Sequence, residues 1–302
     1  MAAEAVYGEP PPVLAQVGPD AVQVSPLKPG AEAIEDLAES SLARVVVRTP
    51  GGALERRYVL AHALRALVPG GELTALAPKT RGGARLAGEL AAFGCEVHEH
   101  ARRHHRICRT RRPTETKGLD AAIAAGGPSV APGTGLWSQP GVFSWDRLDP
   151  GTALLLRAAP SLTGRGADLG CGIGVLALKV LDSLDVTSLT CIDIDRRALA
   201  AARRNLHDPR ATFVQHDIRA SAAGPTDLDF VIMNPPFHDD GQEDRGLGLA
   251  FISAAASMLR TGGVCWMVAN IALPYEARLN AVFNRSSVSA RDGGYKIYEA
   301  IR

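Results

Sequence analysis

The stretch from Asp229 to His238 reads Asp-Phe-Val-Ile-Met-Asn-Pro-Pro-Phe-His, and it decides the fold of this chain. Its first half is apolar and partly β-branched, which is typical of a buried strand. Pro235 and Pro236 end that strand, because proline has no backbone N–H to donate to a central ladder. We therefore expect a polar amide, two rigid carbonyls and an aromatic ring at the carboxyl end of a strand, where open α/β sheets bind ligands.

The side chains at this strand end fit a planar amine. The side-chain oxygen of Asn234 and the carbonyl of Pro235 can each accept a hydrogen bond from an N–H, and Phe237 offers a flat apolar face. Two acceptors beside an aromatic ring suit a nucleobase or an amide that carries an –NH2 group. The alternative is a simple turn after a buried strand, in which Asn234 serves only as a cap.

Composition indicates a globular chain in a reducing compartment. The 302 residues are enough for two domains of ordinary size, and 46% of them are hydrophobic and 22% charged. The net charge of +1 gives no overall field that attracts a polyanion, so nucleic-acid contact requires a local patch. The five cysteines have no Cys-x-x-Cys spacing, which indicates neither a zinc site nor a disulfide framework. No leader and no membrane-spanning apolar run is expected.

Two parts of the chain show the same order of elements. In the second half, a strand at 228–233 ends at Asn-Pro-Pro, a helix follows at 251–259, and Leu-x-x-Gly-Gly leads into a strand at 264–269. In the first half, a strand at 42–47 ends at Arg-Thr-Pro, a helix follows, and Leu-x-x-Gly-Gly leads into a strand at 72–77.

We interpret this order as a diverged internal repeat. The first copy keeps the scaffold and loses the chemistry, because Arg48-Thr49-Pro50 replaces the Asn-Pro-Pro triplet and no glycine-rich loop precedes it. The alternative is coincidence, since Gly-Gly turns before strands are common.

One strongly basic run lies in the first half. Residues 101–113 hold six arginines and two histidines and no acid. The functional interpretation is phosphate binding, and the alternative is a solvated edge strand whose charges prevent edge-to-edge pairing. We expect RNA contact from Arg102, Arg103, Arg106, Arg109, Arg111 and Arg112.

A glycine-rich loop opens the second half of the repeat. Residues 167–174 read Ala-Asp-Leu-Gly-Cys-Gly-Ile-Gly and precede an apolar helix at 175–184. Glycines at 170, 172 and 174 let the backbone take positive φ and approach a ligand closely. The dinucleotide fingerprint is one residue longer and lacks the acid Asp168, which would repel a pyrophosphate. The loop suits a cofactor with a cationic sulfonium and an ammonium group.

Two further acids follow at strand ends. Asp193 ends a strand at 189–192, where an acid can accept both hydroxyls of a ribose. Asp195 is better placed as the N-cap of a helix at 196–205, and Asp149 as the N-cap of a helix at 149–159. Asp217 ends a strand at 212–217 and either accepts from an adenine amino group or is a turn acid.

On these motifs the chain resembles the class I S-adenosylmethionine-dependent methyltransferases, and Asn-Pro-Pro-Phe is similar to motif IV of the members that methylate amino groups. In particular, the chain is similar to the bacterial 16S ribosomal RNA guanine-N2 methyltransferase family. Five stretches carry the likeness: 140–144, 168–174, 234–238, 268–275 and 295–298.

The resemblance implies an α/β fold of two tandem Rossmann-like class I methyltransferase domains (a seven-stranded mixed sheet flanked by helices), with the N-terminal domain degenerate. It divides the chain into an irregular segment at 1–40, a degenerate RNA-binding or structural domain at 41–116, a linker at 117–136 and a catalytic domain at 137–302. The run Gly164-Arg165-Gly166 departs from the family, because it shortens the strand before the glycine loop.

The resemblance also implies an activity, which is transfer of a methyl group from S-adenosylmethionine to the exocyclic N2 amine of a guanine in small-subunit rRNA. Other amine acceptors (23S rRNA guanine, DNA adenine, protein glutamine) and a non-catalytic RNA-binding assembly factor are the alternatives. We expect a cytoplasmic monomer that acts on rRNA or the small subunit, without membrane or metal. His238 either relays the released proton or is structural. The implied cofactor contacts are Asp168, Gly170, Gly172, Gly174, Asp193, Asp217 and Asn234, and the implied catalytic residues are Asn234, Pro235, Pro236 and Phe237.

Overall fold

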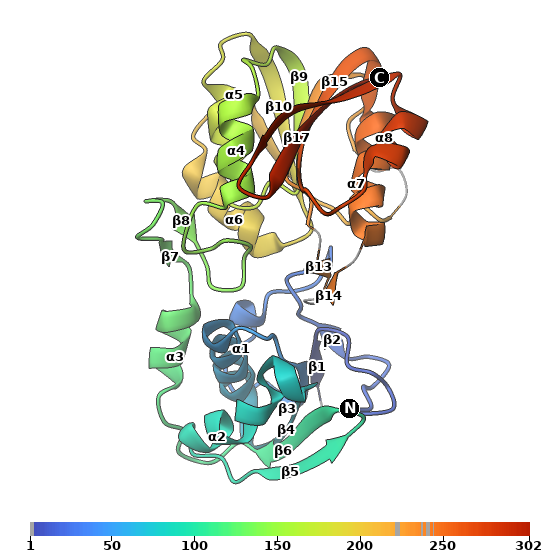
Figure 1. The fold of residues 1–302 in the computed structure, drawn as a ribbon. Helices are drawn as coiled ribbons and strands as arrows, with labels where there is room; N and C mark the ends of the chain where they lie inside the picture. Colours follow the sequence, from blue (N-terminus) through green and yellow to red (C-terminus); the bar gives the residue numbers. More distant parts are fainter. Residues whose placement is uncertain (1–2, 221–223, 237, 240–241, 244) are drawn as a thin grey trace. The chain divides into compact units, whose positions relative to one another are not determined.

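The computed structural model describes residues 3–220, 224–236, 238–239, 242–243 and 245–302. The chain forms two compact units (Figure 1). Unit 1 comprises Met1–Pro128 with Gln139–Gly141, and unit 2 comprises Ser129–Ser138 with Val142–Arg302.

Unit 2 contains a seven-stranded mixed sheet in the order β11-β10-β9-β12-β15-β17-β16. The first five strands of this order are parallel, and β17 is antiparallel to both of its neighbours. The predicted fold class is therefore confirmed. The strands are β9 (Gly164–Leu169), β10 (Val186–Asp193), β11 (Ala211–Gln215), β12 (Leu228–Met233), β15 (Leu259–Asn270), β16 (Arg285–Asp292) and β17 (Tyr295–Ile301).

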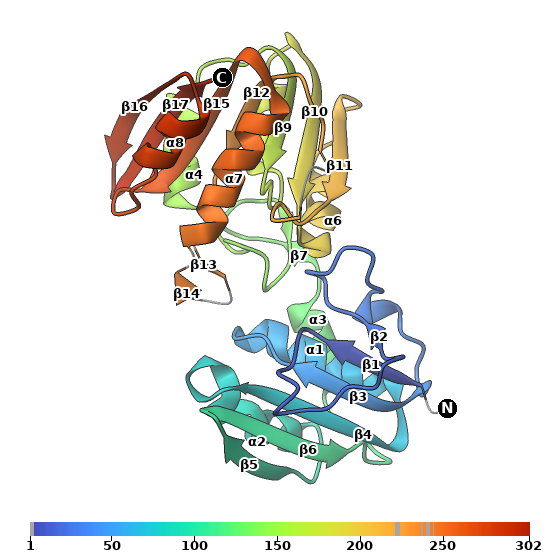
Figure 2. The same cartoon turned by 90° about the vertical axis from the view of Figure 1, so that its right-hand side faces the viewer.

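Helices cover both faces of this sheet, with α7 and α8 on the face toward the viewer in Figure 2. Alternate side chains of β12 enter two different cores: Phe230 and Ile232 pack with α4, α5 and α6, whereas Val231 and Met233 pack with α7 and α8. Burial on both faces explains why β12 is apolar without alternation. The helices are α4 (Pro150–Ala158), α5 (Val175–Leu181), α6 (Arg196–Asn205), α7 (Arg245–Met258) and α8 (Glu276–Val282).

The two predicted helix caps of unit 2 are confirmed. The Asp149 side chain accepts a hydrogen bond from the backbone N–H of Thr152 at 2.8 Å, and Pro150 occupies the first turn of α4. The Asp195 side chain accepts from the N–H of Arg197 at 2.9 Å at the start of α6. Short two-stranded ribbons pair β7 (Ser129–Val130) with β8 (Trp137–Ser138) and β13 (His238–Asp239) with β14 (Gln242–Glu243).

Unit 1 contains a six-stranded sheet in the order β2-β1-β3-β4-β6-β5. Its strands are β1 (Glu4–Tyr7), β2 (Val22–Gln23), β3 (Leu42–Arg48), β4 (Leu67–Pro78), β5 (His98–Arg102) and β6 (His105–Arg111). Its helices are α1 (Ala53–Ala66), α2 (Ala84–Ala92) and α3 (Leu119–Gly126), with the short turns η1 (Ile34–Asp36) and η2 (Lys79–Gly83).

Two boundaries predicted for unit 1 were wrong. The segment 1–40 is not wholly irregular, because β1 lies between β2 and β3 in the sheet and its Ala5 and Val6 are buried. A four-residue strand ahead of three prolines gives too short a pattern to recognise. The segment 117–136 is not only a linker, since it holds α3, where Gly126 packs against the side chain of Tyr58 on α1.

The internal repeat is confirmed by strand order and by register. In unit 1, Leu42 pairs with Leu67 and Arg44 with Glu72, so an advance of two residues along β3 matches an advance of five along β4. In unit 2 the same shift occurs, because Leu228 pairs with Leu259 and Phe230 with Val264. In both units the Leu-x-x-Gly-Gly run forms this irregularity, and its first glycine has a φ near 80°.

Candidate active site

The glycine loop lies between β9 and α5. Gly170, Gly172 and Gly174 have φ values of 71°, 53° and 89°, which side chains with a Cβ rarely adopt. A Cβ added to Gly172 would meet no atom within 4 Å, so the backbone there borders open space. The loop is fixed to β10, because the N–H groups of Gly170 and Cys171 both donate to the carbonyl of Ile192. The positive φ values explain why glycine occupies these positions, and close approach of the backbone to a cofactor stays a prediction.

Asp168 lies at the end of β9 and is fully buried. Among the described residues, none donates a hydrogen bond of normal geometry to either of its carboxyl oxygens. Burial, and secondarily the charge of Asp193, raises the pKa of Asp168 to about 8, against a smaller opposing effect of the Ala177 N–H in the first turn of α5. A buried, unpaired carboxylate is costly unless a cation neutralises it. Asp168 therefore fits a cofactor that carries an ammonium group.

Asp193 lies at the end of β10 and holds the glycine loop. Its Oδ2 accepts a hydrogen bond from the N–H of Gly172 and its Oδ1 from the N–H of Asp195, both at 2.8 Å. Burial raises the pKa of Asp193 to about 6, and these backbone donors oppose the rise. Each carboxylate oxygen has a second lone pair. Asp193 can therefore hold the loop and still accept from a ribose diol, and the ribose contact stays a prediction.

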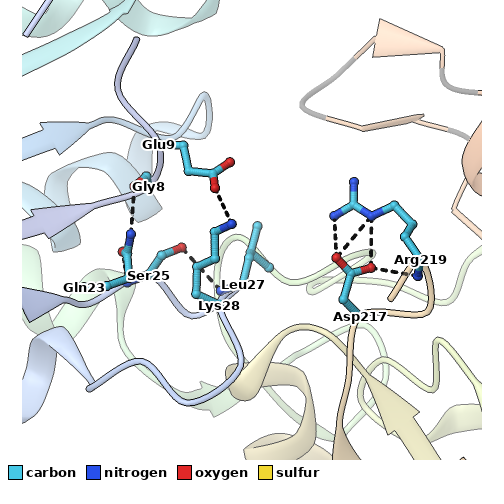
Figure 3. A network of polar contacts seen from close by, with 8 residues as sticks. All are labelled: Gly8, Glu9, Gln23, Ser25, Leu27, Lys28, Asp217 and Arg219. Atoms are coloured by element: carbon cyan, nitrogen blue, oxygen red, sulfur yellow. Dashed lines mark hydrogen bonds and ion pairs between the residues drawn. The ribbon is translucent and has the colours of Figure 1, made fainter. Parts of the chain in front are cut away.

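Asp217 lies two residues beyond β11 and pairs with Arg219 (Figure 3). The Arg219 guanidinium donates to Oδ1 and Oδ2 at 2.9 Å each, and its backbone N–H also donates to Oδ1. Hydrogen bonds from Arg219 hold the pKa of Asp217 below its usual value. This geometry is that of the turn acid, and the adenine contact stays a prediction.

Asn234 follows β12, which pairs with β9 in the sheet. Because Met233 pairs with Leu169, the two chain segments leave the sheet side by side, and a Cβ added to Gly170 would lie 4.0 Å from the Asn234 carbonyl oxygen. Pro235 is buried and Pro236 half-buried. The structure thus brings Asn234, the prolines and the glycine loop together at the carboxyl edge of the sheet, and their role in binding stays a prediction. Phe237 and the side chain of His238 lie outside the described residues.

The amide of Asn234 has one defined orientation. Its Nδ2 donates to Oδ2 of Asp149 at 2.9 Å and to Oγ1 of Thr152 at 2.8 Å. Both amide hydrogens are therefore used, and among the described residues none donates a hydrogen bond to Oδ1. The sequence predicted Asp149 only as a helix cap and did not single out Thr152, because no local pattern links them to a residue more than 80 positions away.

The basic run of unit 1 lies on the β5–β6 hairpin, and only part of it is available to a ligand. Arg112 is a structural residue, because its guanidinium donates to the carbonyls of Arg65 and Leu67 and its side chain is 10% exposed. Arg106 pairs with an acid, Glu99, and Arg111 with Glu72. The exposed arginines of the hairpin with no ion pair among the described residues are Arg102, Arg103 and Arg109.

Comparison with known proteins places the chain in a family. The model of the methyltransferase small domain matches residues 133–299, more than half of the chain, and the chain belongs to this family. The ribosomal RNA small subunit methyltransferase C of Shewanella sp. (strain MR-4) is 38% identical over 158 residues, which is 52% of this chain and 46% of that relative. The protein of the same name from Shewanella halifaxensis is 38% identical over 164 residues, 54% of this chain and 48% of its own length. The chain thus matches about half the length of these curated relatives.

A solved structure matches along the whole chain. The T. thermophilus 16S rRNA N2 G1207 methyltransferase, in complex with AdoMet and guanosine, has a TM-score of 0.80 and 24% sequence identity. The match covers 100% of this chain and 88% of that one. At this identity the likeness shows a shared fold, which includes both units.

The helices and the metal-binding side chains of the described residues bear on a membrane or metal role. Within the described part of the chain, no helix is both long and apolar enough to span a membrane. Over the same residues, no group of three or more His, Cys, Asp or Glu side chains is placed to hold a metal ion.

Proposed function

We propose that this chain transfers a methyl group from S-adenosylmethionine to the N2 amine of a guanine in small-subunit rRNA. The observation that carries the proposal is the Asn234 amide beside the glycine loop, whose Oδ1 has no donor within the described part of the chain, at a site whose buried acid Asp168 suits a cation. The names of the similar curated proteins, and the AdoMet and guanosine bound by the T. thermophilus enzyme, support this choice of cofactor and substrate.

The residues of the site fit the cofactor in separate ways. Asp168 would hold the ammonium group, Asp193 the ribose hydroxyls, and the positive-φ glycines would allow close backbone contact. When bound, S-adenosylmethionine supplies an electrophilic methyl group, and its departure leaves a neutral thioether.

The substrate is held by the Asn-Pro-Pro run. The guanine leaves its stack, and its two N2–H bonds donate to Oδ1 of Asn234 and to the carbonyl of Pro235. Pro235 and Pro236 would keep that carbonyl fixed, so the two acceptors would hold N2 in one orientation for direct transfer of the methyl group from the cofactor. N2 then loses one proton to solvent, because it becomes acidic as the bond forms. Phe237 would stack on the base.

RNA binding is assigned to unit 1. Arg102 and Arg109 lie on neighbouring strands and share one face of the sheet with His98 and His100, because His98 pairs with Arg109 and alternate residues of β5 share a face. All four side chains are exposed. With Arg103 in the turn, this surface offers positive charge to an RNA backbone. We propose that the protein works as a cytoplasmic monomer on rRNA or on the small subunit.

The test is to locate the methyl group after incubation with labelled cofactor. Immature small subunits, naked small-subunit rRNA, large-subunit rRNA, DNA and a protein with a glutamine acceptor are offered separately. Label in small-subunit rRNA, with or without ribosomal proteins, is the expected result. Label confined to another macromolecule, or RNA binding without any transfer, would overturn the proposal.

A further inference from the structure

We infer that Asp149 and Thr152 are positioning residues that lock the Asn234 amide with its oxygen toward the acceptor amine. The inference rests on the proposed role of Asn234 and adds two residues that act through it. Both come from the first turn of α4, far from β12 in sequence, and meet Asn234 in unit 2.

The orientation follows from what each partner can accept. An ionised carboxylate has no hydrogen to donate, so the atom of Asn234 that lies 2.9 Å from Asp149 must be the amide nitrogen. The Thr152 hydroxyl accepts the second amide hydrogen at 2.8 Å. A flipped amide would place its oxygen against the Asp149 carboxylate and lose that contact, and only the Thr152 hydroxyl, turned to donate, could still bond it. One rotamer is therefore strongly favoured, and in that rotamer Oδ1 faces away from α4.

The two positioning groups are themselves held in place. Oδ2 of Asp149 also accepts the backbone N–H of Thr152 at 2.8 Å, so the N-cap bond and the Asn234 bond share one oxygen. Thr152 is buried, and a Cβ added to Gly151 would lie 2.9 Å from the Tyr295 ring. The charge of Asp149 also contributes to raising the pKa of the Tyr295 hydroxyl, after burial. The first turn of α4 is thus packed on β17, and the acid cannot swing away without losing its cap.

The charge of Asp149 has a second effect. A carboxylate that accepts from the amide N–H polarises the amide, which increases the negative charge on Oδ1 of Asn234. Positive charge develops on N2 as its bond to the methyl carbon forms, and an acceptor fixed beforehand stabilises it without reorganisation. A helix cap alone requires only a side-chain oxygen, which asparagine or serine also supplies. The acid therefore serves the site beyond the helix.

The first test compares single variants. Asp149→Asn keeps a side-chain oxygen for the cap and removes the charge, so we expect kcat to fall roughly tenfold with an unchanged KM for the cofactor. Thr152→Val should reduce kcat by a similar factor, and Thr152→Ser should restore it. Matched controls are Asp182→Asn, an exposed acid paired with Lys179, and Thr212→Val on β11, both of which should leave kcat unchanged.

The second test is a reciprocal exchange. Asn234→Asp sets two carboxylates against each other and should abolish transfer. Adding Asp149→Asn to that variant restores a donor–acceptor contact, and we expect at least a tenfold gain over Asn234→Asp alone. A cap that acts only on helix stability predicts no gain from the second substitution, and that result would overturn the inference.

A third readout does not depend on methyl transfer. In the NMR spectrum of the wild-type protein, both Asn234 side-chain amide protons should exchange slowly with water, and Thr152→Val should accelerate the exchange. Fast exchange in the wild type, or no change in the variant, would refute the inference that Asp149 and Thr152 fix the Asn234 amide, even if guanine methylation is confirmed. Conversely, a slow exchange with no guanine methylated would refute the proposed function and leave the lock standing.

Discussion

In both units the residue at the end of a strand bonds the neighbouring loop, but that residue is a charged carboxylate in unit 2 and a neutral amide in unit 1. At the end of β10 in unit 2, the Asp193 carboxylate accepts from Gly172 of the loop and from the N–H two residues on. At the end of β2 in unit 1, Gln23 contacts the corresponding two places, but toward the loop it is a donor: its amide nitrogen donates to the carbonyl of Gly8, and its oxygen accepts from the N–H of Ser25 (Figure 3). The neutral amide keeps the loop in place but provides no charge for a ribose.

The ends of β12 and β3 differ in the same way. In unit 2 the strand is followed by Asn234, whose Oδ1 accepts no hydrogen bond from any described residue and is proposed to accept from the substrate amine. In unit 1 the strand is followed by Pro50 and Gly51, whose carbonyls already accept from the guanidinium of Arg56. Arg56 is held by Glu89 through two bonds of 2.6 Å. Unit 1 therefore satisfies these strand ends internally, whereas in unit 2 a carboxyl group and an amide oxygen have no hydrogen-bond donor among the residues that the structure describes.

The largest effect should come from removing the buried ion pair between Arg56 and Glu89 in unit 1. Glu89→Ala leaves the guanidinium of Arg56, whose side chain is 1% exposed, without its counterion. We expect the free energy of unfolding of unit 1 to fall by about 3–5 kcal/mol, measured by denaturant titration. The control is Glu72→Ala, which removes the exposed partner of Arg111 and should cost about 1 kcal/mol or less. Equal costs would contradict the comparison.

The matching change in unit 2 should affect turnover instead. Asn234→Ala removes the acceptor for the substrate amine, and we expect kcat to fall about 100- to 1000-fold. Cofactor affinity, measured by calorimetry, should change little. Unchanged turnover would show that the free oxygen has no part in the chemistry.

The unsatisfied acid of unit 2 should make cofactor binding depend on pH. Since the pKa of Asp168 is raised from 3.8 to about 8, binding of a cation releases a proton, and affinity should rise about tenfold per pH unit up to about pH 8. Asp168→Asn should lose this dependence together with most of the affinity. An affinity independent of pH from 6 to 8 would argue against an ionised Asp168 in the complex.

The same acid should lower the stability of the free protein at high pH. Because the folded-state pKa lies above the unfolded value, the protonated group favours folding below about pH 4, and this stability is lost as pH rises through about 8. Asp168→Asn should therefore raise the Tm of the cofactor-free protein at pH 8.5 by roughly 3–6 °C. A lower Tm would mean that the carboxylate is stabilised by protein groups.

The smallest effect concerns the surface of unit 1 that is proposed to bind RNA. Substituting alanine for both Arg102 and Arg109 should weaken RNA binding roughly three- to tenfold and reduce the salt dependence by about one to two phosphate contacts. Arg111→Ala, which removes an arginine already paired with Glu72, should have less effect. Filter binding at several salt concentrations measures both quantities, and equal losses would contradict the division of the basic run.

Some of this could be predicted from sequence because the signals are local. The repeat could be recognised from the two Leu-x-x-Gly-Gly runs, because the first glycine of each takes a positive φ that other residues rarely adopt. The end of β12 could be recognised from the Asn-Pro-Pro run. The sequence could not show which arginines are left exposed and unpaired. That depends on the register between β5 and β6, and on the hydrogen bonds from Arg112 to the carbonyls of Arg65 and Leu67. The contact of Asp149 with Asn234 was also hidden, since only the packed fold brings α4 to β12.

The most direct test of the central claim is to determine which atom is methylated. Small-subunit rRNA is incubated with the wild-type protein and S-adenosylmethionine, digested to nucleosides and analysed by mass spectrometry against standards. The free amide oxygen and the proline carbonyl predict N2-methylguanosine as the product, in an amount that grows with enzyme. Methylation of a ring nitrogen, a carbon or a ribose hydroxyl would contradict the account, because the two acceptors proposed in the Asn-Pro-Pro run match the two N–H bonds of an exocyclic amine.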